Sequence, residues 1–436
     1  MTDPGRKVNI VVHADHVAQT IDGFGVNINA RYWNDGKLIP TLDLLRTDLG
    51  ATLYRVDIWG KSNWPDPYST LGPVALEPDR LARLYCGPVF RGGWEMMRYL
   101  NANGIEPYLT CSGVVPAWMC AADGVTLSDL ERFCDMLVSL LVWARREEGL
   151  RFTLFGPLNE TDIGPPEGPF VSPEAYTRVL ALLDRKLNAL GLDDIRFVVA
   201  EQARFDATYM RAILAEPAVL RRVGVWGLHC YSEYTPEQFR EVRELAGATP
   251  LWMTEYGDLE QSGEREWYVA WVMTHRLFDL LEGGFHGALV WDAFDNYHDH
   301  DEAWTIYGLL RTGLRAYTPK HRYYAAKQIF HFVLPGFVRV AAVTADQGIR
   351  VLAFTDSERR RVTVAAMNAG TETVHLNVEL RGFLPELQHE RVTYYRTTAT
   401  ERCHTIGTIP VQGGNWPFRG IDASLPPYSI GTFATI

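Results

Sequence analysis

Two glutamates follow apolar stretches that are typical of buried β-strands. Residues 152–162, FTLFGPLNETD, hold a short uncharged run that glycine and proline break just before Asn159 and Glu160. Residues 251–258, LWMTEYGD, place Glu255 directly after a second run of this kind. Such runs are typical of strands covered on both faces of a parallel sheet. An Asn–Glu pair alone could also be the polar start of a loop, so the inference depends on both glutamates.

The spacing of the two glutamates is compatible with a barrel. Residues 160 and 255 are 95 positions apart, and a strand–helix unit of an eight-stranded barrel takes roughly 30 residues. Glu160 and Glu255 would then lie about three strands apart and face one cavity at the carboxyl ends of the strands. Two such carboxyl groups can cleave a glycosidic bond, since one protonates the leaving oxygen and the other attacks the anomeric carbon.

The order of the remaining segments predicts an α/β fold. Strands are predicted near residues 22–29, 52–59, 106–112, 152–156, 196–201, 223–231, 251–255 and 287–292, with helical segments between them. A capping box at 128–131, a capped helix start at 235–238 and an N-cap at Ser172 mark three of the helix starts. Eight strand-then-helix alternations predict a closed (β/α)8 TIM barrel.

In the last hundred residues, apolar and polar residues alternate with a period of two, which differs from the pattern of the preceding segments. Short two-periodic segments separated by turns at intervals of about ten residues are typical of a β-sandwich. Residues 7–20 have the same alternation, so the N-terminal strands are expected to complete that sandwich. The predicted domains are residues 1–20 and 334–436 for the sandwich and residues 21–333 for the barrel.

Composition narrows the possible partners. The chain has 436 residues and a net charge of −11, which argues against nucleic acid or an anionic membrane as a partner. It has neither a membrane-length apolar stretch nor the apolar core of a signal peptide, which predicts a cytoplasmic protein unless a leader has been removed. Its six cysteines have no metal-site spacing and are expected to be free thiols, without a metal or other cofactor. The sequence does not indicate the oligomeric state.

Five motifs resemble one group of enzymes. They are GFGVN at 23–27, SGVVPAWM at 112–119, LNE at 158–160, TEYG at 254–257 and YYAAKQIFHFVLPGFVRV at 323–340. The chain resembles the clan A retaining glycoside hydrolases, and most closely glycoside hydrolase family 30, over nearly its whole length. The resemblance implies a barrel with a side β-sandwich, Glu160 as general acid/base and Glu255 as nucleophile.

The resemblance also implies supporting residues. Asn159 would hold the 2-hydroxyl of the sugar, Tyr231 would bind the nucleophile, and Arg55 would lie beside it. Trp291 would form an apolar floor under the reactive sugar, because sugars stack on indole. Arg55 agrees with its setting, since a basic residue in an apolar strand needs a carboxylate partner and Glu255 is a natural one.

Two interpretations are open for each of three residues, His229, Trp118 and Trp291. His229 points to the same face as Tyr231 and could equally be a hydrogen-bonded core histidine. Trp118 could shape the sugar subsite or be barrel packing, and Trp291 could also be packing. Where several relatives have GFGG, this chain has GFGVN at residues 23–27, so the loop of the first strand, with Asn27, is expected to line the site differently.

The loop at residues 292–302 is acidic and rich in histidine. It carries Asp295, His298, Asp299, His300, Asp301 and Glu302, with almost no positive charge. A site that selects an acidic sugar needs arginine there, so a neutral glycan is predicted. The same residues could form a metal site, although ligands so close in sequence seldom converge on one ion.

Two alternatives to a hydrolase remain open. A transglycosylase uses the same covalent intermediate and differs in whether water or a sugar hydroxyl reaches it first. A non-catalytic carbohydrate-binding barrel is the other alternative, although the glutamate pair argues against it. The sugar, its linkage and exo or endo action are not predicted.

Overall fold

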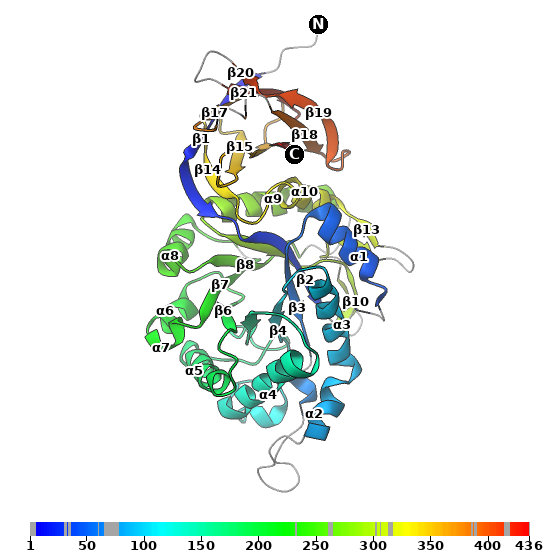
Figure 1. The fold of residues 1–436 in the computed structure, drawn as a ribbon, viewed down its shortest axis with the longest axis vertical. Helices are drawn as coiled ribbons and strands as arrows, with labels where there is room; N and C mark the ends of the chain where they lie inside the picture. Colours follow the sequence, from blue (N-terminus) through cyan, green and yellow to red (C-terminus); the bar gives the residue numbers. More distant parts are fainter. Residues whose placement is uncertain are drawn as a thin grey trace.

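The molecule consists of a barrel and a β-rich body stacked along its long axis (Figure 1). The structure is a computed structural model that describes residues 6–29, 33, 36–59, 61–64, 78–231, 233–259, 265–300, 303–305, 307–312, 317–384, 387, 390–413 and 419–435. Eight parallel strands close the barrel, and ten strands form the sheet of the second body. The predicted (β/α)8 barrel with a side β-sandwich is therefore confirmed.

The barrel strands follow each other in sequence order around the ring. They are β2 (Gly23–Asn29), β3 (Leu53–Asp57), β4 (Tyr108–Thr110), β5 (Leu154–Gly156), β6 (Arg196–Ala200), β7 (Val223–Cys230), β8 (Leu251–Tyr256) and β9 (Gly287–Val290). Parallel pairing of β9 with β2 closes the ring. Gly25 is needed for this geometry, because a Cβ there would collide with the carbonyl of Leu53 in the neighbouring strand.

Helices surround the barrel. They are α1 (Ile39–Leu44), α2 (Pro78–Tyr85), α3 (Pro88–Ala102), α4 (Leu130–Val142), α5 (Pro173–Ala189), α6 (Thr208–Leu214), α7 (Pro217–Leu220), α8 (Pro236–Ala246), α9 (Glu266–Glu282) and α10 (His321–Phe330). The caps at Ser172 and Thr235 are confirmed, and Thr235 forms a capping box with Gln238. The predicted capping box at Ser128 is wrong. Asp129 caps α4 by accepting from the Arg132 amide, because the Ser128 hydroxyl donates to the Met119 carbonyl instead.

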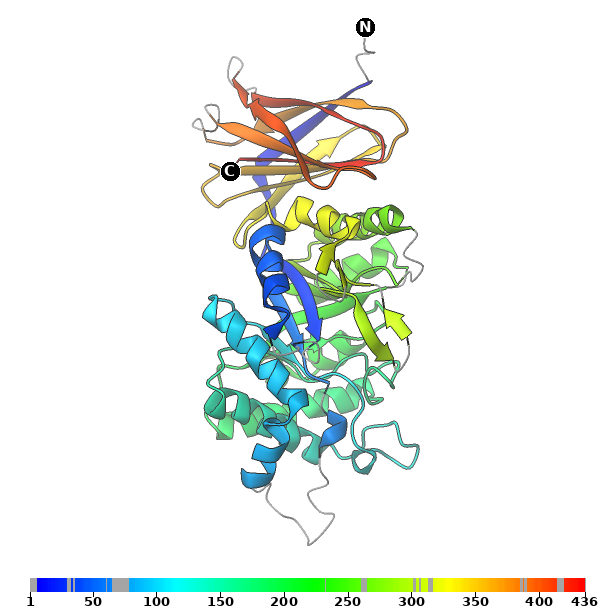
Figure 2. The same cartoon turned by 90° about the vertical axis from the view of Figure 1, so that its right-hand side faces the viewer.

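The second body is a folded ten-stranded sheet. Its strands are β1 (Arg6–Thr20), β14 (Val338–Thr344), β15 (Ile349–Thr355), β16 (Val362–Asn368), β17 (Val374–Arg381), β18 (Arg391–Thr397), β19 (His404–Pro410), β20 (Gln412–Gly413), β21 (Arg419–Leu425) and β22 (Ser429–Thr435). Strand β1 pairs with β14 on one side and β17 on the other, so the N-terminal segment completes the sheet. Figure 2 shows its strands in two layers, which enclose an apolar core that includes Val12, Val364 and Phe433.

Helices α9 and α10 lie where the two bodies meet (Figure 1). The Gln328 amide on α10 donates to the Thr397 hydroxyl at 2.8 Å, and Thr432 donates to the Gln328 carbonyl at 2.7 Å. All three side chains are buried. Buried polar groups with satisfied hydrogen bonds hold a specific arrangement, because separating them leaves unpaired donors and acceptors.

Two expectations about composition can be compared with the structure. All six cysteines lie in the described part of the chain and are free thiols, and Cys111, Cys134 and Cys230 are buried. Among the described helices, none combines the length and the apolar character that a bilayer crossing requires.

Candidate active site

Glu160 and Glu255 lie together at the mouth of the barrel. Glu160 follows β5, the fourth barrel strand, and Glu255 lies in β8, the seventh, so the two strands are three apart. One carboxylate oxygen of each and one ring nitrogen of His229 all lie within 4.8 Å of one another. All three side chains are buried. The two glutamates predicted from the sequence therefore lie close together, and His229 of β7 lies beside them within the same distance.

Glu255 is held at both carboxylate oxygens. Arg55 of β3 donates to Oε1, and the Tyr231 hydroxyl donates to Oε2 at 2.7 Å. Burial raises the pKa of Glu255, while the charges of His229 and Arg55 oppose that rise. The two donors fix the direction of the carboxylate, which a nucleophile needs in order to reach one carbon atom.

Arg55 is fully buried and also orients two amides. It donates to Asn159 Oδ1 at 2.6 Å and to Asn27 Oδ1 at 2.9 Å. The Asn27 amide in turn donates to the carbonyls of Thr254 and Val290. Asn27 therefore ties β2 to β8 and β9, whereas Asn159 keeps an NH₂ group that can donate to a ligand.

His229 binds Glu160 directly. Its Nδ1 lies 2.7 Å from Glu160 Oε1 and 3.6 Å from Glu255 Oε2. Burial alone would lower the pKa of His229, but the surrounding carboxylates, Glu255 first, raise it to about 10. His229 is therefore a buried cation that donates to Glu160 at neutral pH.

Glu160 and Glu201 have left-handed backbones, with φ of 46° and 41°. Residues other than glycine seldom adopt this conformation, and they do so mostly at functional sites. The Glu160 amide donates to the Glu201 carbonyl at 2.9 Å, and the Glu201 amide donates to Gly227 in β7. These bonds turn the chain sharply at the ends of β5 and β6 and aim the Glu160 side chain across the barrel mouth.

The carboxylate of Glu201 is a site residue that sequence reasoning missed. It is fully buried, accepts from the Tyr108 hydroxyl, and lies 3.5 Å from Arg55 Nε and 3.8 Å from His229 Nε2. Burial would raise the pKa of Glu201, but the attraction of Arg55 and His229 holds it below its usual value. The segment FVVAE at 197–201 has the same apolar-run-then-glutamate pattern as the other two strands, and this signal could have revealed it.

Glu167 is a second residue that the sequence did not reveal. It lies in the loop after β5, where its carbonyl accepts from the Gly113 amide at 2.9 Å. The next residue, Gly168, lies so close to the Asn159 carbonyl that a Cβ there would be 2.5 Å from it. Burial and the charges of Glu160 and Glu255 raise the pKa of Glu167 to about 8. The Glu167 carboxyl group is therefore near enough to Glu160 and Glu255 for their charges to act on it.

The two predicted tryptophans lie in different places. The Trp291 amide donates to the Tyr256 carbonyl at 2.9 Å, which places the Trp291 backbone next to the end of β8, where Tyr256 directly follows Glu255. Trp118 lies instead along a cavity of about 760 Å³ lined by residues of α4, α5 and α7. The Arg132 guanidinium lies 5.7 Å from the centre of its ring. Within the described contacts, Trp118 belongs to the outer helix layer rather than to the glutamates.

The loop after β9 contains a two-stranded sheet of β10 (Asn296–His300) and β11 (Ala303–Thr305). Its Asp295 is buried and forms an ion pair with Lys320 at 2.6 Å. The positive charge that the loop itself lacks is thus supplied from outside it, 25 positions later in the chain. The metal site that the sequence left as an alternative cannot be placed, because the side chains of His298, Asp299, His300, Asp301 and Glu302 lie outside the described residues.

Comparison with known proteins gives structural relatives only. The sequence matches no protein-family model and no curated protein. The structure is similar to a glycoside hydrolase family 30 subfamily 8 xylanase from Clostridium acetobutylicum, with a TM-score of 0.74, 18% identity and coverage of 98% of this chain and 100% of that one. It is also similar to an endo-β1,6-glucanase, with a TM-score of 0.70, 16% identity and coverage of 98% and 94%. A GH39 enzyme from Xanthomonas axonopodis pv. citri has a TM-score of 0.65, 14% identity and coverage of 100% and 98%. The chain therefore has the fold of these hydrolases, as the motifs indicated.

Proposed function

We propose that the protein is a retaining glycoside hydrolase that cleaves β-glycosidic bonds of a neutral glycoside or oligosaccharide. The observation that carries this proposal is the convergence of the two glutamates: one carboxylate oxygen of each lies within 4.8 Å of the other, which is compatible with the shorter of two known carboxyl spacings. Retaining glycosidases have carboxyl groups about 5–5.5 Å apart, whereas inverting enzymes need about 6.5–9.5 Å to admit a water molecule. The fold shared with known glycoside hydrolases supports the same reaction class.

In the first step, Glu160 donates a proton to the leaving oxygen while Glu255 attacks the anomeric carbon. The bonds from Arg55 and Tyr231 hold the Glu255 carboxylate in line for this attack. The free NH₂ of Asn159 donates to the sugar 2-hydroxyl, a bond that strengthens as the ring becomes cation-like. Trp291 supplies the apolar face against the sugar.

In the second step, Glu160 acts as a base and removes a proton from the water that attacks the glycosyl-enzyme. Its carboxylate form accepts a hydrogen bond from charged His229 at 2.7 Å. If a sugar hydroxyl reaches the intermediate before water, the same residues perform transglycosylation. The product mixture separates these outcomes.

A neutral sugar agrees with the cations near the site. Arg55 binds Glu255 and the two asparagines, and Arg276 donates to the carbonyls of Gly257 and Tyr231. Lys61 donates to the Cys111 carbonyl. Each of these three cations of the described chain is committed to protein acceptors, so none of them offers the arginine fork that a uronate would need.

The test is azide rescue followed by NMR. Glu160→Ala and Glu255→Ala are assayed with nitrophenyl β-glycosides and with β-linked xylo- and gluco-oligosaccharides, with and without sodium azide. Loss of the acid/base leaves the covalent intermediate open to azide, so Glu160→Ala yields the β-glycosyl azide. Loss of the nucleophile leaves room for direct attack, so Glu255→Ala yields the α-glycosyl azide. Wild type yields product of retained configuration.

The control is Glu244→Gln on the exposed face of α8, which is expected to retain wild-type activity. A wild-type product of inverted configuration refutes the retaining mechanism. Full activity in Glu255→Ala refutes the assignment of the nucleophile. Saturable sugar binding without turnover of any substrate supports the carbohydrate-binding alternative.

A further inference from the structure

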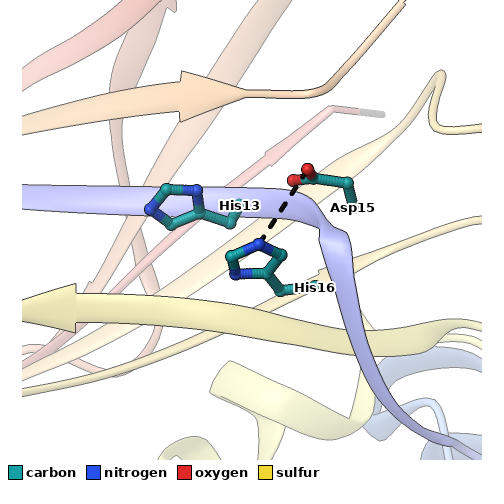
Figure 3. A group of neighbouring side chains, drawn as sticks. All are labelled: His13, Asp15 and His16. Atoms are coloured by element: carbon teal, nitrogen blue, oxygen red, sulfur yellow. Dashed lines mark ion pairs between the residues drawn. The ribbon is translucent and has the colours of Figure 1, made fainter.

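An irregularity in β1 brings three side chains to one side of the strand. Strand β1 pairs regularly with β14 up to His13, and the register then shifts before Val17. In a regular strand, residues 13 and 16 would point to opposite faces. Here the rings of His13 and His16 are stacked, with centroids 4.8 Å apart and planes 9° from parallel (Figure 3). One ligand atom from each of His13, Asp15 and His16 lies within 4.8 Å of the other two.

Asp15 is positioned by the turn that follows β17. Gly382 in that turn has a φ of 76°, and a Cβ added there would lie 3.1 Å from Asp15 Oδ1 and 3.3 Å from the Asp15 amide nitrogen. The glycine therefore admits the aspartate where a larger residue would crowd it. His16 Nε2 lies 4.0 Å from Asp15 Oδ2, as the dashed line in Figure 3 shows.

The surrounding charges allow a cation to bind. Arg381 lies opposite His13 in the parallel pairing of β1 with β17, but it makes two bonds of 2.8 Å to Glu379, so its charge is compensated. The side chains of Asp15 and His16 are 55% and 64% exposed. An ion can therefore reach the three residues without opening the fold.

We propose that His13, Asp15 and His16 form a binding site for a divalent transition metal of the zinc class. Two imidazole nitrogens and one carboxylate oxygen are ligands that zinc accepts, whereas calcium and magnesium prefer oxygen alone. Tetrahedral zinc with bonds of about 2.0–2.1 Å needs ligand atoms about 3.3 Å apart. Rotation of the exposed side chains can close the present spacing, and water completes the fourth position.

The site lies where β1 passes from the sandwich to the barrel. The first half of β1 pairs with β17, while Gln19 near its end donates to the carbonyls of Leu281 and Phe285 at the end of α9. Figure 3 shows the strand turning near Asp15, between these two attachments. A bound ion would fix that bend and so hold the sandwich in place on the barrel.

Isothermal titration of zinc chloride into the full chain, freed of metal with a chelator, tests the proposal. Wild type is expected to bind one zinc ion per chain. His16→Ala, and separately the isosteric Asp15→Asn, should weaken binding by more than about tenfold, since loss of even an outer-shell partner costs that much. In NMR spectra, zinc should perturb the imidazole signals of His13 and His16.

The matched control is His375→Ala. His375 Nε2 lies 3.8 Å from Asp422 Oδ1 on the same sheet, a single histidine–aspartate pair, with side-chain exposures of 36% and 39%. This variant should bind zinc as wild type does. Equal zinc affinity of wild type and His16→Ala would overturn the proposal, because it would show that the ion binds elsewhere, for example at the barrel mouth. Absence of saturable binding would overturn it as well.

Discussion

The chain gathers histidine and carboxylate groups within 4.8 Å of one another at two places. At the barrel mouth, His229, Glu160 and Glu255 are buried. On the bulge of β1, the irregular stretch between His13 and Val17, Asp15 and His16 are more than half exposed. The residue types are nearly the same, so the difference between the two groups shows what burial and neighbours add.

At the barrel mouth, the carboxylates already accept hydrogen bonds from protein groups. Both oxygens of Glu255 accept hydrogen bonds, and Glu160 accepts from His229. The guanidinium of Arg55 occupies the position beside Glu255 that a metal ion would need, and its charge repels a second cation. Burial strengthens each of these interactions, so the buried group is suited to moving protons and the exposed one to binding ions from water.

The largest effect is expected for Arg55→Met, which tests how strongly burial acts on the charges at the barrel mouth. The change removes the charge that compensates Glu255 and Glu201, and breaking a buried pair costs about 3–5 kcal/mol. Urea unfolding should therefore show a large loss of stability, together with loss of glycosidase activity. The control is Arg240→Met, which removes an exposed ion pair with Glu237 and should cost about 0–1 kcal/mol. Similar losses in both variants would show that burial does not distinguish the regions.

His229→Gln tests whether the buried histidine is a cation. The folded protein keeps the His229 proton up to pH about 10, because burial is outweighed by Glu255, Glu160 and Glu201. The unfolded chain releases this proton near pH 6.5. Wild-type stability should therefore fall as the pH rises from about 6.5 to 10, and this dependence should be weaker in the variant.

The same His229→Gln variant should lose about 100-fold in kcat, since Glu160 no longer accepts from a charged donor. The control is His375→Ala, because His375 is exposed on the sandwich. The measurement is urea unfolding at a series of pH values, with kcat measured on the same samples. Parallel stability curves for wild type and His229→Gln would contradict a cationic His229.

Glu167→Gln has a smaller expected effect, confined to the alkaline side. Burial and the charges of Glu160 and Glu255 raise the pKa of Glu167 to about 8, so it is neutral below that pH. Above it, wild type carries an additional negative charge near the other two carboxyl groups, and the variant lacks this charge. The variant should retain activity within about threefold at pH 6, and its pH profile should differ from that of wild type only on the alkaline side, by less than about one pH unit.

The measurement is kcat/KM against pH, with Glu244→Gln as the control. Identical alkaline limbs in wild type and Glu167→Gln would remove Glu167 from the site. A large loss at pH 6 would instead give it a direct role in catalysis.

The barrel and the glutamate pair could be predicted from sequence because both depend on local patterns. An apolar run that ends in a polar residue marks a strand and its reactive end, and the order of eight such units fixes the ring. Glu160 and Glu255 were found in this way. Glu201 carries the same signal, but its part in the site depends on its contacts with Tyr108 and Arg55, which join three strands.

Other features depend on loop conformation, which sequence periods do not encode. Ser128 and Asp129 are both good helix caps, and the contact of Ser128 with Met119 decides between them. The loop after β4 carries Trp118 outward to α4 and α5. Lys320 compensates Asp295 although the residues are far apart in sequence. Each of these features depends on the path that a loop takes in space, which the sequence pattern does not predict.

His16→Ala is expected to have the smallest effect of all. In chelator, its stability should stay within about 0.5 kcal/mol of wild type, since substitutions of exposed residues outside special features rarely exceed that. Activity should be unchanged, because the bulge is remote from Glu160 and Glu255. The measurement is urea unfolding in chelator, repeated with zinc, where wild type should gain stability and the variant should not. A loss above about 2 kcal/mol in chelator would show that the stacked rings stabilise the bend of β1 without metal, and the contrast with the buried group would then be one of degree.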